Sequence, residues 1–402
     1  MSGPMDGIRV VEVGVWVAGP SAGGILADWG AQVVKIEPHG GDPYRWVFAQ
    51  GRAPDGGPIH NAAFEMDNRG KRSLAVDVTS EDGLAIAMRL ISDADVFVTN
   101  MRTRALEQWG LDHDTLCARF PRLVYASVTG YGTEGPDRDR ASYDFGGFWA
   151  RSGIAAAITQ EGTPPPAQRG GMGDHTTSLG LTAGICAALF EREKTGRGQW
   201  VSTSLLRAGV YVLGWDTSMA LRSVTLPPGF RRASAVNPSF NCYQDADGRW
   251  FWLLGLEGDR HWPSLVRAVG RPELLDDPRY STLRERMGRT AELVEMLDGI
   301  FAGAPISHWA AAFDREDVWW APIQTTTEVL DDPQAKAAGV FVDGTMAEGP
   351  ARVVATPIDF SRTRWAPGGP SPEVGQHTEE LLLELGNDWD RIIGLKEGGV
   401  IP

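Results

Sequence analysis

The chain has 402 residues, of which 42% are hydrophobic and 22% charged, so it can bury a large core and is expected to form two domains. Its formal net charge of −14 argues against nucleic acid as a bulk partner, because phosphate binding needs a basic face. No apolar run reaches the length of a membrane-spanning helix and the N-terminus has no secretory pattern, so we expect a cytoplasmic protein.

Strands and helices alternate through the N-terminal half. Residues 8–13 form a β-branched run typical of a buried strand, the small residues after them favour a helix, and 32–37 form a second strand. A strand–helix–strand unit of this length predicts parallel pairing. The alternation continues, with further strands expected at 73–78, 95–100 and 122–132 and helices at 81–94, 103–109 and 112–120.

The second half predicts a change of architecture. Residues 141–173 lose clear period and gather glycine and proline, as in a surface excursion, and Asp174 then opens a long helix that ends at Gly196. A strand (199–203) and a helix (205–221) follow. Aromatic strands around Asp247 and Gly248 predict a hairpin, which two helices follow. We expect an α/β protein with a Rossmann-like large domain, residues 1–225 and 326–402, and a smaller α+β domain, residues 226–325.

Common cofactor and metal motifs are missing from the sequence. The turn GVWVAGPSAGG matches neither the dinucleotide fingerprint nor the phosphate loop, and no Gly-x-Ser-x-Gly elbow occurs. The seven histidines lack metal-ligand spacing, and Cys117, Cys186 and Cys242 are interpreted as packing residues. We therefore expect no metal site and no permanently bound cofactor.

A series of strings along nearly the whole chain resembles one family. They are GIRVVEVGVWVAGPSAGGILADWGAQVVKIEPHGGDPYR, NRGKRSLAVD, VFVTNMRTRALEQWGL, PRLVYASVTGYGTEGP, GDHTTSLGLTAGICAALFEREKTGRGQWV, DDPQAKAAG and GQHTEELLLELG. In this order they resemble the class III coenzyme A transferases, the group that includes formyl-CoA:oxalate and carnitine CoA-transferases and the α-methylacyl-CoA racemases. The resemblance implies acyl-CoA and a small carboxylic acid as substrates and an interlocked homodimer, with the active site near the domain and subunit junction.

Asp174 is the expected catalytic residue. Its carboxylate stands at a helix N-terminus after glycines that allow close approach of a ligand, and the helix dipole is expected to keep it ionised. A plain helix cap is the alternative interpretation. The resemblance implies that this aspartate carries the acyl group as an anhydride and then CoA as a thioester, which moves CoA from an acyl-CoA to an acid.

Basic and small residues near strand ends are the candidates for binding CoA. Matching the family's motif positions, they are Lys71 and Arg72 in NRGKRSL, Asn100, Met101, Arg102 and Arg104 in TNMRTR, and Val17, Ala18 and Pro20 in the first turn. His39 stands where relatives often have arginine or proline, which makes it a doubtful ligand.

Tyr143 favours a transferase over a racemase. Racemase members have a catalytic histidine before the aspartate in the segment matching ASYDF, and tyrosine is a poor replacement for that base. Tyr143 is also a candidate for lining the site, or a buried structural residue. An acyl-CoA racemase or epimerase and a non-catalytic acyl-CoA binder stay open as alternatives.

Two further observations concern the substrate and its protection. The small domain offers only GLEGD (255–259), without the run of consecutive glycines that some transferases use as a loop over the site. Aromatic residues in the segments that could reach the acyl pocket mildly indicate a bulky or apolar acid, although core packing explains them equally: Trp16, Trp46, Phe48, Phe148 and Trp149.

Overall fold

The computed structural model describes residues 3–47, 61–224, 226, 229–347 and 349–402, and the chain forms two compact units. The larger unit contains residues 1–157, 166–226 and 336–402, and the smaller contains 158–165 and 227–335. The chain thus re-enters the larger unit at Lys336 and not at position 326, and residues 158–165 group with the smaller unit. Over the described ranges no helix has the length and apolar character needed to cross a membrane.

A six-stranded parallel sheet forms the centre of the larger unit, as the sequence predicts. Its strand order is β3-β2-β1-β4-β5-β6. The bounds are Arg9–Val13 (β1), Gln32–Glu37 (β2), Arg72–Ala75 (β3), Val96–Thr99 (β4), Val124–Thr129 (β5) and Trp200–Ser204 (β6). The order reverses between β1 and β4, and open parallel sheets bind ligands beyond the carboxyl ends of the strands at such a point.

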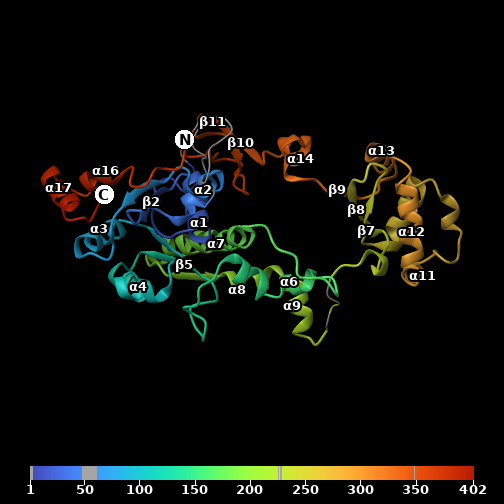
Figure 1. Cartoon of the computed structure of the whole chain (residues 1–402), viewed down its shortest axis with the longest axis horizontal. Helices are drawn as coiled ribbons and strands as arrows, with labels where there is room; N and C mark the ends of the chain where they lie inside the picture. The colour runs from blue at the N-terminus through green and yellow to red at the C-terminus, as the bar shows by residue number, and fades with distance from the viewer. Residues whose placement is uncertain (1–2, 48–60, 225, 227–228, 348) are drawn as a thin grey trace. The chain divides into compact units, whose positions relative to one another are not determined.

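Helices cover both faces of this sheet, because side chains alternate along each strand. Val10 of β1 faces the core under α1 (Ala18–Asp28) and α7 (Met172–Thr195), together with Leu181. Val11 faces the opposite core, which Ile86 and Leu382 share. The helices of that face are α3 (Glu81–Ser92), α4 (Thr103–Trp109), α5 (His113–Arg119), α16 (Thr378–Glu384) and α17 (Trp389–Glu397). Figure 1 shows the C-terminal helices α16 and α17 beside α3.

Some predicted elements differ from the structure. The stretch expected as an irregular excursion contains a π-helix, η2 (Phe145–Ala150), and α6 (Ile154–Ile158). The helix expected at 205–221 is divided into α8 (Leu205–Val212) and α9 (Gly214–Ala220). The remaining elements of the larger unit are η1 (Pro43–Trp46), α2 (Ala62–Asn68), and the hairpin β10 (Phe341–Met346) and β11 (Gly349–Val354).

The smaller unit has its own aromatic core around a three-stranded antiparallel sheet. Strands β7 (Phe240–Gln244) and β8 (Trp250–Leu254) form the hairpin predicted around Asp247 and Gly248, and β9 (Trp320–Pro322) pairs with β8. Gly248 has a φ of 78°, a conformation that glycine adopts without strain. The main helices are α10 (Gly258–Ala268), α11 (Leu283–Met287), α12 (Thr290–Phe301), α13 (Ile306–Glu316) and α14 (Thr326–Asp331).

Candidate active site

A cavity of about 520 Å³ lies beyond the carboxyl ends of β1, β4 and β5. Val15, Asn100 and Gly130, which follow these three strands, line it, and Asp174 reaches it from α7. Its wall is largely apolar and aromatic, with Trp16, Val128, Tyr131, Tyr143, Phe145 and Leu205, and three arginines join it: Arg102, Arg138 and Arg140. The cavity therefore combines one carboxylate with apolar and cationic surfaces.

Asp174 is not the cap of its helix. Helix α7 begins at Met172, and its N-cap is Gly171, whose φ of 80° suits glycine. Asp174 is thus the third residue of the first turn. Gly173, just before it, must be glycine because a Cβ there would lie 2.6 Å from Phe148 and 2.8 Å from the Cβ of Asp144. The close packing of this turn brings Asp144 and Asp174 together.

The Asp174 carboxyl group has an unusual environment. Among the described residues it accepts no hydrogen bond and forms no ion pair. Burial, followed by the negative charge of Asp144, raises the pKa of Asp174 to about 7; Asp67 adds to this rise and His175 opposes it. The expectation that the helix dipole keeps this group fully ionised is therefore wrong, since desolvation and like charges outweigh it. The raised pKa therefore leaves both the protonated and the ionised form of Asp174 accessible near neutral pH.

Two more carboxylates and one imidazole surround Asp174, and we call Asp67, Asp144, Asp174 and His175 the carboxylate cluster. Asp144 is buried and accepts the N–H of Gly173 at 3.2 Å. Asp67 lies 3.0 Å from Nε2 of His175. Asp67 and His175 are 108 positions apart and meet only in the folded chain, so no local sequence pattern predicts a role for them.

Polar contacts fix the first turn beside the cavity. The side-chain amide of Asn100 donates to the carbonyl of Val15 at 2.6 Å, and its oxygen accepts the N–H of Val15 at 3.0 Å. Trp16 has a φ of 65°, rare for a bulky residue, and its N–H donates to Oδ1 of Asp42 at 3.0 Å. The Trp16 ring meets Tyr143 edge to face at 5.2 Å. The half-exposed Tyr143 thereby forms part of the cavity wall.

The structure brings only some of the predicted site residues to the cavity. Ala18, Asn100, Met101, Arg102, Tyr143 and Asp174 line it. Val17 and Pro20 are buried in the turn and start of α1, and Arg104 is exposed on α4; none of these three lines it. Arg138 and Arg140, which the sequence interpretation missed, do line it; their position in a glycine-rich stretch after β5 was the available signal.

Lys71 and Arg72 do not fit the predicted role of binding phosphate. The Lys71 ammonium is fully buried, 2.8 Å from Oε2 of Glu12, and it also donates to Pro20 and Asn68. Arg72 is paired with Glu380 and Glu384 of α16. Both cations are thus neutralised within the protein, and neither borders the cavity.

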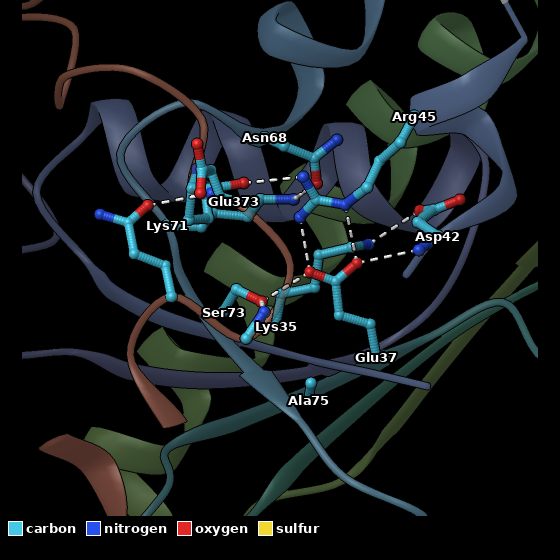
Figure 2. A network of polar contacts seen from close by, with 12 residues as sticks. Lys35, Glu37, Asp42, Arg45, Asn68, Lys71, Ser73, Ala75 and Glu373 are labelled. Carbon is cyan, nitrogen blue, oxygen red and sulfur yellow. Dashed lines mark hydrogen bonds and ion pairs between the residues drawn. The ribbon is translucent and has the colours of Figure 1, made fainter. Parts of the chain in front are cut away.

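Lys71 belongs to a buried ion-pair network that contacts the first turn, the segment after β1. The network consists of Glu12, Lys35, Glu37, Asp42, Arg45 and Lys71. Lys35 lies 2.9 Å from Glu12 and 3.0 Å from Asp42. Figure 2 shows Lys35 and Arg45 directed at the carboxylates of Asp42 and Glu37. Because Asp42 also accepts the N–H of Trp16, this network positions the cavity wall.

The charges of this network offset the cost of burial. Burial alone would raise the pKa of Glu12, but Lys35 and Lys71 outweigh it and lower the pKa. Burial would lower the pKa of Lys35, yet Glu12, Asp42 and Glu37 raise it. For Lys71, burial prevails and lowers the pKa to about 8. Burial of Glu37 is likewise outweighed by Arg45 and Lys35, which lower its pKa, so the cations of the network favour the ionised form of both glutamates, whereas the pKa of Asp174 is raised.

A second cavity, of about 490 Å³, lies at the ends of β1, β2 and β3. Pro38, His39 and Asp77 line it, and it shares Val15 and Met101 with the first cavity. Nε2 of His39 is 3.0 Å from the carbonyl of Val400. The two cavities together follow the carboxyl edge of the sheet.

The aromatic residues expected near an acyl group have different positions. Trp16 lines the first cavity, whereas Trp46 is exposed and donates to the carbonyl of Gly40. Phe148 and Trp149 are buried with Ile154 in a small cluster. Phe48 lies outside the described residues.

Comparison with known proteins identifies the family. A model described as CoA-transferase family III matches residues 5–378. The chain is 32% identical over 398 residues to the (R)-2-hydroxy-4-methylpentanoate CoA-transferase of Clostridioides difficile, covering 99% of both chains. It is 32% identical to the cinnamoyl-CoA:phenyllactate CoA-transferase of Clostridium sporogenes, covering 95% of this chain and 93% of the relative. The crystal structure of a CAIB/BAIF family protein from Brucella suis is similar, with a TM-score of 0.84, 31% identity, and 96% and 100% coverage of the two chains. This chain belongs to the family III CoA-transferases and uses CoA thioesters as substrates.

Proposed function

We propose that Asp174 is the nucleophile that carries first the acyl group and then CoA. The single observation that supports this most is a carboxylate on the wall of an apolar cavity that has no partner among the described residues. A carboxylate engaged in a salt bridge would be a weaker nucleophile, and Asp174 forms no salt bridge with any residue in the described ranges. The ionised form of Asp174 is the reactive one.

The proposed steps balance without water or added base. An oxygen of Asp174 attacks the thioester carbonyl, the C–S bond breaks, and CoA leaves as thiolate. The thiolate then attacks the Asp174 carbonyl of the anhydride and releases the donor acid as a carboxylate. The acceptor carboxylate repeats both steps in reverse, so each bond formed matches one broken. Exclusion of water protects the intermediates.

We further propose that the two cavities hold one CoA molecule. The cavity at His39 and Asp77 takes the nucleotide end, and the shared residues Val15 and Met101 border the pantetheine. Arg102 has no carboxylate partner among the described residues, which makes it the first candidate for a phosphate contact.

For the acid we propose a branched or aromatic carbon skeleton. The apolar wall of Trp16, Val128 and Phe145 supports this. The names of two relatives, which contain 4-methylpentanoate, cinnamoyl-CoA and phenyllactate, point to the same class. A panel of acids against one donor tests it: transfer to short dicarboxylic acids alone would contradict the proposal.

We also propose that a second copy of the chain covers α8 and α9. Three large apolar side chains are strongly exposed there: Tyr211 (85%), Trp215 (77%) and Leu221 (80%). A single exposed apolar residue is normal, but several in one short segment indicate an interaction surface. Light scattering is expected to give the mass of a dimer, and Trp215→Glu that of a monomer. A monomeric wild-type chain would exclude this assembly.

The decisive experiment traps Asp174. The protein is incubated with an acyl-CoA and then with borohydride, which reduces an aspartyl thioester, and the α7 peptide is analysed by mass spectrometry. We expect the modification on Asp174, and Asp174→Asn should lose at least about 10³-fold in transfer while still binding CoA. Absence of modification with every competent donor would contradict a covalent route. Incorporation of solvent deuterium at Cα of a 2-methylacyl-CoA would instead indicate racemase chemistry.

A further inference from the structure

The histidine after Asp174 is held in a defined position. Nε2 of His175 lies 3.0 Å from Oδ1 of Asp67. The same ring lies over Gly171, with Cε1 and Nδ1 only 3.2 and 3.4 Å from the point that a Cβ there would occupy. The glycine at the helix start therefore leaves room for the imidazole, and Asp67 fixes its far end.

Asp67 is itself fixed by the packing of α2. Its side chain is 1% exposed, and a Cβ on Gly24 of α1 would lie 2.7 Å from its backbone carbonyl oxygen, so the two helices are in close contact. The next residue, Asn68, accepts a hydrogen bond from Lys71 at 3.0 Å. The second carboxylate oxygen of Asp67 is buried without a hydrogen-bond partner among the described residues. A buried carboxylate of this kind needs a nearby positive charge.

The charges around Asp174 are unbalanced without that histidine. Asp144 at the start of η2 and Asp67 of α2 both carry negative charge toward it. Tyr44 of η1 is neutral, because burial and then the surrounding carboxylates raise its pKa to about 12. Lys71 is close to Asp67 but is bonded to Glu12, Pro20 and Asn68. Within the part of the chain that the structure describes, the remaining cationic side chain that acts on Asp174 is His175.

We propose that His175, clamped by Asp67, is a positioning residue that places an imidazolium beside Asp174 and keeps the Asp174 carboxylate available. Burial would lower the pKa of His175, but the hydrogen bond to Asp67 and the charges of Asp67, Asp174 and Asp144 raise it above its ordinary value, which favours the cationic form of the imidazole. The imidazolium offsets the two neighbouring carboxylates. This inference rests on the proposed function in taking ionised Asp174 as the nucleophile.

The test separates the charge of His175 from its hydrogen bond. His175→Gln still donates to Asp67 but has no charge, whereas His175→Lys keeps the charge. In protein labelled with ¹³C at aspartate Cγ, the Asp174 resonance is assigned by its absence in Asp174→Asn and titrated from pH 5 to 9. We expect the pKa of Asp174 to rise by about one unit in His175→Gln and to stay near the wild-type value in His175→Lys.

A double variant provides a matched control. In His175→Gln with Asp67→Asn both charges are lost together, so the pKa of Asp174 should return close to the wild-type value. A purely structural role predicts the opposite, a double variant at least as disturbed as the single one. Equal titration of wild type and His175→Gln, with unchanged circular dichroism and Tm, would overturn the proposal. A rise in the pKa of Asp174 that is as large in His175→Lys as in His175→Gln would also overturn it.

Kinetics give a second readout. The acid limb of kcat/KM should move up by about one pH unit in His175→Gln, with activity about tenfold lower at pH 6 and little changed at pH 9. The titration does not depend on acyl transfer, so the two proposals fail separately. If Asp174 is trapped but its pKa does not change in His175→Gln, only the proposed role of His175 is contradicted. If the pKa of Asp174 changes in His175→Gln but no modification of Asp174 is trapped, only the proposal that Asp174 is the nucleophile is contradicted.

Discussion

The ion-pair network and the carboxylate cluster are both buried in the larger unit, yet the pKa values of their carboxyl groups shift in opposite directions. In the network three carboxylates, Glu12, Glu37 and Asp42, face three cations, and the pKa of Glu12 and of Glu37 is lowered. In the cluster three carboxylates face one imidazole, and the pKa of Asp174 is raised to about 7. Burial is common to both, so the partners decide the outcome.

This contrast separates stability from reactivity. The network satisfies its charges and holds Trp16 and α2 in place, which is a structural task. The cluster leaves Asp174 without a partner among the described residues, a state that costs stability and that suits the proposed nucleophile. Substitutions in the ion-pair network should therefore mainly change stability, and substitutions in the carboxylate cluster should mainly change the pKa of Asp174 and the transfer rate.

The largest effect is expected for Lys35→Met, which leaves Glu12 and Asp42 with one buried cation fewer. Removing one partner of a buried pair costs about 3–5 kcal/mol, so urea unfolding should show a loss of that size. Arg72→Met is the matched control: its partners Glu380 and Glu384 are exposed, and the loss should stay below about 1 kcal/mol. Similar losses of unfolding free energy in both variants would show that the buried ion pairs contribute no more to stability than the exposed ones.

The next effect concerns the packing that brings Asp144 and Asp174 together. Gly173→Ala places a methyl group 2.6 Å from Phe148, which should cost about 1–3 kcal/mol of unfolding free energy and reduce transfer. Gly180→Ala in the same helix has no atom within 4 Å of the new methyl group and should stabilise by up to about 1 kcal/mol. If both variants behaved alike, the close approach at Gly173 would not matter.

Asp174→Asn should raise the melting temperature while it abolishes transfer. The pKa of Asp174 is higher in the folded state than its ordinary 3.8, so the folded protein disfavours the ionised form. This cost begins above the unfolded pKa and is complete above about pH 7. Differential scanning calorimetry should therefore find a larger gain for Asp174→Asn at pH 8 than at pH 5. A gain independent of pH would assign the effect to packing instead.

The smallest effect is expected for Asp144→Asn. The amide oxygen can still accept the N–H of Gly173, but the negative charge beside Asp174 is gone. The pKa of Asp174 should fall, and the acid limb of kcat/KM should move down by about one pH unit. Asp139→Asn, a change at an exposed residue paired with Arg138, serves as the control and should leave the limb in place.

The sequence was sufficient for features that depend on local pattern. The parallel sheet, the stop of α7 at Gly196 and the position of Asp174 near a helix start follow from periodicity and glycine placement. Lys71 was misjudged because its partner Glu12 is 59 positions away in the sequence. His175 and Asp67 are 108 positions apart, and no local string contains both. The protonation of Asp174 depends on the same distant neighbours.

The left-handed backbone of Trp16 limits how the wall of the first cavity, the proposed acyl site, can be redesigned or can diverge. Most side chains resist a positive φ, so a library at position 16 will be dominated by variants whose first turn no longer fits, except for glycine, asparagine and aspartate. Tyr143 and Phe145 line the same cavity without that backbone constraint. Changes in acid preference are therefore more accessible at those two positions, and an apparent loss of specificity at Trp16 will often be a loss of loop conformation.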